Sequence, residues 1–434
     1  MNDMSVDAFP LRAPTRMADL GLNEVMQRDL LLKTMFRQNL RSPTELSDAL
    51  KVLPPVVDEL LDLAKGQGLV ETLGVRSASL RSEMRYGLTE SGKARALDAL
   101  EQSEYFGPFP VPMADFARLV EMQSIRKARI SREMLERSMG HLVLPKGLLD
   151  QLGPAVNSGR SILLYGPPGN GKSSISNGIR DALADTILVP RVIELAGQII
   201  AVYDPVIHRR VEEAPRVDAQ GLRLAGPGHD PRLIRCKRPS VITGGELTLD
   251  MLDLNFNPIS KTYQAPLQLK ASGGVFIVDD LGRQAQPPMA LINRWIVPME
   301  KGFDLLSLHS GQKFEVPFDT LVIFSTNFAP SELFDGAALR RVYYKIKVDR
   351  PSRDDFIKIF ARTCKAYGVK PDEGVLTHLL RDLYPTTKKG FAAYHAPFLI
   401  DQALSICAYE GRPRELTNEL IDRAWANLYV DDED

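Results

Sequence analysis

The feature that most constrains this chain is a glycine-rich segment, Gly166-Pro167-Pro168-Gly169-Asn170-Gly171-Lys172-Ser173. It fits the pattern of a glycine, four residues and then Gly-Lys-Ser/Thr. An apolar run over 161–165 precedes it, and a helix is expected over 174–184. A strand, loop and helix in this order present backbone N–H groups and a helix N-terminus to phosphate oxygens. The segment from Gly166 to Ser174 therefore predicts an ATP phosphate site, with Lys172 on the β- and γ-phosphates and the Ser173 hydroxyl on Mg²⁺.

Two further apolar runs end in polar residues. Residues 275–278 lead into Asp279 and Asp280, and the run over 321–326 leads into Asn327. Because open α/β sheets bind ligands at the carboxyl ends of their strands, we expect these residues to lie near the glycine-rich loop. Asp279 would hold Mg²⁺, Asp280 would polarise the attacking water, and Asn327 would orient the same water. The three segments together predict that the chain binds and hydrolyses ATP.

These motifs resemble those of the AAA+ ATPases over about residues 140–430. The glycine-rich loop is similar to their Walker A loop, Asp279-Asp280 to Walker B, and Ser325-Thr326-Asn327 to sensor 1. The resemblance implies an α/β P-loop NTPase fold, in which a parallel sheet lies between helices and a C-terminal α-helical lid follows. Many members have Asp-Glu in Walker B, and the shorter Asp280 carboxylate indicates slow turnover.

Residues 335–342 are similar to the segment that carries the arginine finger of these ATPases. The resemblance implies that Arg340 or Arg341 reaches the ATP site of a neighbouring subunit, and it does not choose between them. It also implies a homo-oligomeric ring, which we expect to be a hexamer. An exposed basic pair at a helix end is the alternative interpretation, because cations are favoured there anyway.

Residues 411–416 resemble the sensor 2 segment of the same family. We expect Pro413 at the first helical position, which would put Arg414 in the first turn. An arginine is unfavourable at that end of the helix dipole unless an anion meets it. The resemblance therefore implies that Arg414 contacts ATP, with Arg412 as the alternative.

Residues 304–316 alternate in polarity around a Ser-Gly pair, which predicts a β-hairpin. A hairpin before sensor 1 resembles the branch that holds MoxR-type ATPases and magnesium chelatase motor subunits. The stretch over 194–271 is long for this family, so we expect an insertion near 200–270. Its basic part over 208–238 is either a polyanion patch or a solvated loop. Val202-Tyr203-Asp204 is the nearest candidate for a pore loop, which leaves polypeptide threading unproven.

Residues 21–100 have the pattern of a separate α+β domain. Ser42 to Glu45 forms a capping box with Pro43 at the first helical position, and Gly66 to Gly68 ends a later helix. Three helices followed by two strands resemble a winged helix-turn-helix domain. The expected elements are helices over 23–37, 43–50 and 54–65, and strands over 69–73 and 84–88.

The charges of this domain indicate which kind of partner it binds. Its third helix carries Asp58, Glu59 and Asp62, which would meet repulsion from DNA phosphates. The wing is more basic, with Arg76, Arg81 and Arg85 against Glu83. Docking of a protein client is therefore favoured, and DNA contact through the wing is the rival hypothesis.

Composition limits which other classes of protein the chain can belong to. The net charge of −1 provides no whole-molecule attraction to nucleic acid, and the apolar runs are too short for a membrane span. Three cysteines without paired spacing suit the cytoplasm. The predicted division is a lead-in over 1–20, a winged helix domain over 21–100, a Pro-rich linker and helix over 101–139, an ATPase core over 140–349 with a hairpin near 303–317, a lid over 350–430 and an acidic tail over 431–434. Within the third segment, a single helix is expected over 114–139.

The function predicted from these features is a remodelling ATPase that acts on a protein client as a ring. A DNA-associated loader or regulator is the first alternative. A slow ATP-dependent switch is the second, because Asp280 replaces the longer glutamate.

Overall fold

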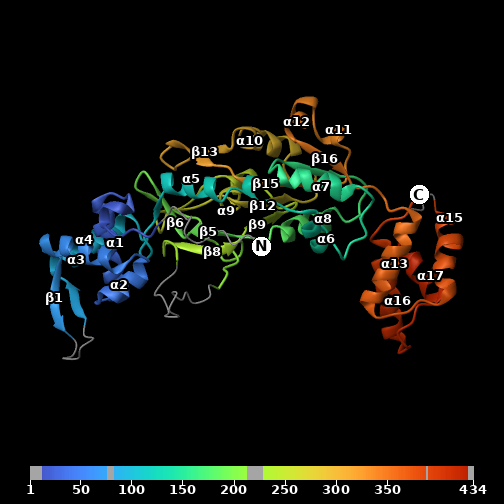
Figure 1. The fold of residues 1–434 in the computed structure, drawn as a ribbon, viewed down its shortest axis with the longest axis horizontal. Helices are drawn as coiled ribbons and strands as arrows, with labels where there is room; N and C mark the ends of the chain where they lie inside the picture. The colour runs from blue at the N-terminus through green and yellow to red at the C-terminus, as the bar shows by residue number, and fades with distance from the viewer. Residues whose placement is uncertain (1–11, 76–82, 213–227, 388–389, 429–434) are drawn as a thin grey trace.

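The computed structural model describes residues 12–75, 83–212, 228–387 and 390–428. Figure 1 shows the N-terminal helices at one end, in blue, and the C-terminal helices at the other end, in orange and red. The two five-stranded sheets lie between these two groups of helices, and β1 (Val70–Val75) lies at the blue end beside the N-terminal helices. The wing arginines Arg76 and Arg81, most of the predicted lead-in and the acidic tail lie outside the described residues, as does part of the basic stretch over 208–238.

The central sheet has five parallel strands in the order β16-β4-β15-β12-β9. Every position of β12 and β15 is buried, which explains the continuous apolar runs that precede the polar motifs. The carboxyl ends of all five strands meet at one edge. The strands are β4 (Ile162–Tyr165), β9 (Ser240–Thr243), β12 (Gly274–Val278), β15 (Thr320–Thr326) and β16 (Tyr344–Lys347).

Helices cover both faces of this sheet. One core joins alternate residues of the strands to α6, α7 and α8, and another joins the intervening residues to α10 and α12. A parallel sheet between two helical layers confirms the expected α/β P-loop NTPase fold class. The helices are α6 (Arg132–Ser138), α7 (Leu148–Asn157), α8 (Lys172–Ala182), α10 (Pro288–Lys301), α11 (Pro330–Leu333) and α12 (Gly336–Arg341).

A second, mixed sheet lies beside the first, in the order β10-β11-β7-β6-β3. Its apolar residues share a core with α5 (Met113–Met122), with the β5–β8 pair and with the β13–β14 hairpin. The predicted insertion near 200–270 is interrupted, because β9 lies within it and belongs to the central sheet. The strands are β3 (Val111–Pro112), β5 (Thr186–Pro190), β6 (Val192–Leu195), β7 (Gln198–Ala201), β8 (Leu233–Lys237), β10 (Asn255–Asn257) and β11 (Thr262–Gln264).

The expected hairpin is present. Strand β13 (Phe303–Ser307) pairs antiparallel with β14 (Lys313–Pro317), so that Phe303 lies opposite Pro317 and Ser307 opposite Lys313. Leu306 and Val316 are buried in the second core, whereas Leu305 points outward and is half exposed. The hairpin is therefore packed along one face and open along the other.

The expected single helix over 114–139 is wrong. It is divided into α5, a short 3₁₀ turn over Ile125–Lys127, and α6. The break occurs where the buried Asp319 accepts hydrogen bonds from the Ser124 hydroxyl at 2.6 Å and from the Ile125 N–H at 2.9 Å. Because these donors turn toward Asp319, α5 packs in the second core and α6 packs under the central sheet.

The N-terminal domain has the expected elements. The capping box at Ser42 and Glu45 is formed, and β1 pairs antiparallel with β2. The Pro-rich linker that follows is packed rather than open: Phe109 is buried in this domain's core, and its N–H donates to the Leu50 carbonyl at 2.8 Å. The elements are α1 (Glu24–Gln38), α2 (Pro43–Leu50), α3 (Pro54–Gly66), β1 (Val70–Val75), β2 (Met84–Leu88) and α4 (Glu90–Gln102).

The C-terminal region is helical, as expected, and has its own apolar core. Its last helix begins at Asn418, so the expectation that Pro413 opens a helix is wrong. The helices are α13 (Arg353–Tyr367), α14 (Glu373–His378), α15 (Tyr384–Thr386), α16 (His395–Glu410) and α17 (Asn418–Leu428), with a π-helical turn over Leu379–Leu383. Across the part of the chain that the structure describes, no helix has both the length and the apolar character to span a membrane.

Candidate nucleotide site

The glycine-rich loop joins β4 to α8 at the carboxyl edge of the central sheet. Helix α8 begins at Lys172, and Gly171 precedes it in the left-handed conformation. Gly166 has φ of 135°, and a Cβ there would lie 2.4 Å from the Val348 carbonyl oxygen, so only glycine fits. The Ser173 hydroxyl is exposed, whereas Lys172 is only 6% exposed. The loop thus presents a helix N-terminus and a serine to solvent.

The Lys172 ammonium is held by three oxygens. It donates to the Gly166 carbonyl at 2.8 Å, to the Pro167 carbonyl at 2.9 Å and to the Asn327 side-chain oxygen at 2.7 Å. Burial lowers the pKa of Lys172, while the nearby Asp280 and Asp279 carboxylates oppose that shift. The charged ammonium is therefore oriented by the loop itself and by the end of β15.

The two aspartates that follow β12 have different surroundings. Asp279 accepts hydrogen bonds on one carboxylate oxygen from the Ser325 hydroxyl and from the Asp280 N–H. Its other oxygen has no hydrogen-bond donor among the described residues. Asp280 is exposed and has φ of 48°, a left-handed conformation that is uncommon outside glycine. The two carboxylates therefore have different hydrogen-bond partners, Asp279 with Ser325 and Asp280 with Asn327.

Asn327 connects the two other motifs. Its side-chain oxygen accepts from Lys172, and its side-chain nitrogen donates to Asp280 at 3.3 Å. This chain of contacts joins the ends of β4, β12 and β15, which are neighbours in the sheet. The structure thus brings together Lys172, Asp279, Asp280 and Asn327, as sequence reasoning expected.

Sequence reasoning missed Gln284, which shapes the Asp279-Asp280 turn. Its side chain is 9% exposed, accepts from the Gly282 N–H at 2.9 Å and donates to the Gly244 carbonyl at 3.0 Å. The same nitrogen lies 3.4 Å from the Asp280 carbonyl oxygen. The only signal in the sequence is the closeness of Gln284 to the aspartate pair.

Sequence reasoning also missed the contact between the loop and the C-terminal region. The Tyr394 N–H donates to the Gly169 carbonyl at 3.0 Å, and the Ala393 N–H donates to the Asn170 side chain at 3.2 Å. The Tyr394 side chain is 42% exposed beside the loop. The residues just before α16 therefore connect the helical C-terminal region to the predicted phosphate site.

The two candidate finger arginines differ in their contacts. Arg341 forms an ion pair with Glu300, with Nε 2.9 Å from the carboxylate oxygen. Arg340 is exposed and has no ion-pair or hydrogen-bond partner for its side chain within the described ranges. Of the two arginines, Arg340 is thus the exposed one without such a partner in the described part of the chain.

Arg414 is not where the sequence placed it. It lies in the irregular segment before α17 and donates to the Tyr367 carbonyl at 2.9 Å. Arg412 is engaged by Glu410, Glu415 and Glu419. Over the residues that can be placed, neither arginine bonds to the phosphate loop, because both lie at the far turn between α16 and α17.

A family model described as a domain of unknown function, DUF8689, matches residues 352–427, which is the helical C-terminal region. No curated protein sequence matches the chain.

Two solved structures illustrate the structural likenesses. NtrX from Brucella abortus in complex with ADP is 13% identical to this chain and has a TM-score of 0.40. The match covers 79% of this chain and 69% of the NtrX chain. The Thermotoga maritima RuvB Holliday junction branch migration motor is 14% identical to this chain and has a TM-score of 0.35. The match covers 70% of this chain and 72% of the RuvB chain. Scores this low carry no argument about function. The fold class rests on the strand order and the loop geometry described above.

Proposed function

We propose that this chain is an AAA+ ATPase that hydrolyses ATP in a ring and remodels a protein client. The observation that carries the proposal is the chain of contacts from Lys172 through Asn327 to Asp280. An ammonium, an amide and a carboxylate converge there beside a helix N-terminus. These are the groups that bind phosphate and position water in phosphoryl transfer.

The residues present fit ATP and Mg²⁺. The N–H groups at the start of α8 and the Lys172 ammonium suit phosphate oxygens. The exposed Ser173 hydroxyl and the oxygen of Asp279 that lacks a donor are hard oxygen ligands, as Mg²⁺ prefers. Mg²⁺ bound there would neutralise charge on the phosphates. Asp280 and Asn327 would hold the attacking water.

Ring assembly is supported by Arg340. Its side chain is exposed, lies on α12 and lacks a partner within the described residues. A guanidinium that reaches the site of a neighbouring subunit would stabilise the charge of the transition state there. We therefore assign the finger role to Arg340 in preference to Arg341, and take a hexamer as the working stoichiometry.

A protein client is favoured over DNA by the charge on α3. Burial together with the neighbouring Asp62 and Glu83 carboxylates raises the pKa of Asp58, which reports a crowded acidic surface. Such a surface repels DNA phosphates. We propose that the N-terminal domain is a winged helix that docks the client, in a cytoplasmic protein whose cysteines, Cys236, Cys364 and Cys407, are free and buried.

The test is the ATPase rate per subunit measured against protein concentration, with and without duplex DNA. A rate that rises with concentration and falls about 10²-fold in Asp280→Asn would support a shared-site motor. Asp181→Asn, an exposed change on α8, is the matched control and should leave the rate unchanged. A rate independent of concentration would contradict ring assembly. Tight ATP binding with negligible turnover would favour the slow switch, and stimulation by DNA would favour a loader or regulator.

A further inference from the structure

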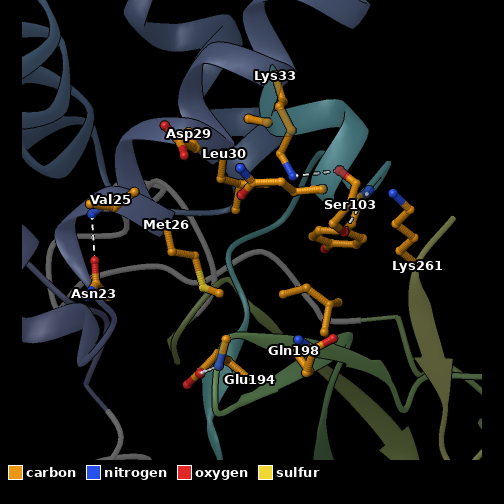
Figure 2. A pocket seen from close by; sticks show the side chains of 15 residues that line it. Asn23, Val25, Met26, Asp29, Leu30, Lys33, Ser103, Glu194, Gln198 and Lys261 are labelled. Atoms are coloured by element: carbon orange, nitrogen blue, oxygen red, sulfur yellow. Dashed lines mark hydrogen bonds between the residues drawn. The ribbon is translucent and has the colours of Figure 1, made fainter. Parts of the chain in front are cut away.

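A cavity of about 490 Å³ lies between the N-terminal domain and the second sheet. Figure 2 shows α1 above it, the chain after α4 at its side and the β6–β7 turn below. It is remote from the nucleotide loop in sequence and shares no lining residue with it. Cavities of this size between domains are typical sites for small ligands.

One face of α1 forms the upper wall. Met26, Leu30 and Lys33 follow one another at helical spacing, so they point to the same side of the helix. In Figure 2, Met26 extends toward Gln198 on the opposite wall. Ile199 is buried and also lines the cavity. The wall is therefore apolar along the first turns of α1 and cationic where Lys33 enters.

Lys33 is the unusual member of this wall. It is only 7% exposed, and its ammonium donates to the Ser103 carbonyl at 3.0 Å. No other acceptor is found for it in the described part of the chain. An ammonium has three N–H donors, and a buried cation without compensation is costly. Burial lowers the pKa of Lys33 to about 8, although the charge of Asp29 opposes this shift.

The neighbouring carboxylate does not neutralise Lys33, because arginines occupy it. Asp29 accepts from Arg95 at 3.0 and 2.5 Å and from Arg28 at 3.0 and 2.9 Å. Asp98 also acts on Arg95, so Arg28, Arg95 and Lys33 stand against the two carboxylates of Asp29 and Asp98. The cluster at this end of the cavity therefore has an excess of positive charge.

The other charged groups at the cavity leave this excess in place. Lys261 reaches the mouth from the β10–β11 turn and donates to the Glu101 carbonyl, which carries no charge. Glu194 is on the opposite wall, where it accepts from the Gly197 N–H at 2.7 Å. Figure 2 shows Lys33 and Lys261 on either side of Ser103, with Glu194 away from both.

We propose that this cavity binds a small amphipathic monocarboxylate. The carboxylate would accept from the Lys33 ammonium, with Lys261 adding positive charge at the mouth, and the apolar body would pack on Met26, Leu30 and Ile199. A carboxylate accepts charge-assisted hydrogen bonds from donors that the protein leaves unused. The occupant would touch both α1 and the β6–β7 turn, and would hold the N-terminal domain against the second sheet. This inference does not depend on the proposed ATPase function.

The test is calorimetric titration of the full chain, without nucleotide, with octanoate and with octanamide. Octanoate carries the carboxylate and an apolar body, and octanamide has the same body without the charge. Octanoate should bind saturably, with a Kd below about 5 mM. Octanamide should bind at least about tenfold more weakly, which is the factor expected for one lost charge-assisted hydrogen bond. Absence of octanoate binding, or equal binding of the two compounds, would overturn the proposal.

Three variants locate the site. Lys33→Gln should weaken octanoate binding about tenfold and bring it close to that of octanamide. Met26→Trp keeps both lysines and puts a larger side chain where the apolar body would lie, so it should weaken binding of both compounds. Lys65→Gln removes an exposed lysine from α3 in the same domain and should bind octanoate normally. Unchanged binding in both cavity variants would place octanoate elsewhere and overturn the proposal. Circular dichroism of each variant establishes that the domain is folded.

Discussion

Lys172 donates a hydrogen bond to the side-chain oxygen of Asn327 at 2.7 Å, although 155 residues separate them in the chain. The two residues follow adjacent strands, β4 and β15, whose carboxyl ends lie at the same edge of the sheet. The contact keeps the ammonium on the loop while the Asn327 amide reaches Asp280. Because this contact orients the Lys172 ammonium, we expect it to affect nucleotide binding.

Lys172→Ala should lower the ATPase rate by about 10²-fold or more, because it removes the only ammonium held inside the loop. It should also weaken binding of a fluorescent ATP analogue. Lys127→Ala is the matched control, since Lys127 is exposed at the turn after α5. A Lys172→Ala protein with normal ATP turnover and client remodelling would contradict the proposed function.

The two arginines on α12 should behave differently. Arg340→Ala should lower the ATPase rate by about 10³-fold, because the finger would be lost from the neighbouring site. Arg341→Ala removes a partly exposed ion pair with Glu300 and should change the rate by less than about threefold.

Mixing subunits tests whether Arg340 acts between them. Arg340→Ala subunits keep Lys172, and Lys172→Ala subunits keep Arg340. A mixture of the two should therefore recover activity that neither has alone. A mixture that stays as inactive as its components would show that Arg340 does not act on a partner's site.

Gly92→Ala should destabilise the N-terminal domain. A Cβ at Gly92, on the first turn of α4, would lie 1.9 Å from the Leu69 carbonyl oxygen, so the helix would have to move. We expect a loss of about 1–3 kcal/mol of unfolding free energy in a urea titration. Gly66→Ala is the control, because a Cβ there meets nothing within 4 Å and Gly66 ends α3. Equal stability of the two variants would contradict the close packing.

Stability of the C-terminal region should fall in mild acid because of His395. This histidine is buried, hydrogen-bonded to the Tyr384 hydroxyl at 2.7 Å, and burial lowers its pKa to about 4. The unfolded chain takes up the proton near the usual value of about 6.5, so stability is complete above that pH. It is lost as pH falls from about 6.5 toward 4, by up to about 3 kcal/mol.

The measurement is the free energy of unfolding at pH 7 and pH 5, followed by tryptophan fluorescence, since Trp425 packs against Tyr384. His395→Gln is the comparison variant, because an amide does not titrate, and its stability should depend less on pH. The half-buried His378 acts in the opposite sense, since its hydrogen bonds to the Asp422 and Asp382 carboxylates raise its pKa. An unchanged pH slope in His395→Gln would contradict the assignment.

Sequence reasoning predicted the site where the pattern was local. The strand before Gly166, the helix after Lys172 and the capping box at Ser42 depend on residues that are close in the chain. It failed where a distant residue decided the geometry. The helix expected over 114–139 is broken by Asp319, which no local pattern near Ser124 reveals.

The same difference between local patterns and distant contacts explains what sequence reasoning missed about the arginines and the C-terminal region. The sequence could not choose between Arg340 and Arg341, because the difference is the ion pair with Glu300 on another helix. It placed Arg414 in a first helical turn, whereas α17 begins only at Asn418. It also had no means to find that Tyr394 touches Gly169.

The sequence by itself determined the phosphate loop, the buried parallel strands and the acidic and amide residues that follow them. Their spacing and apolar runs act over a few residues, so they can be read from the chain. Only the tertiary structure decided which groups meet: Lys172 with Asn327, the packed linker at Phe109, and the buried Lys33 beside its cavity. Those contacts join residues far apart in sequence, and their formation depends on how the separate cores pack.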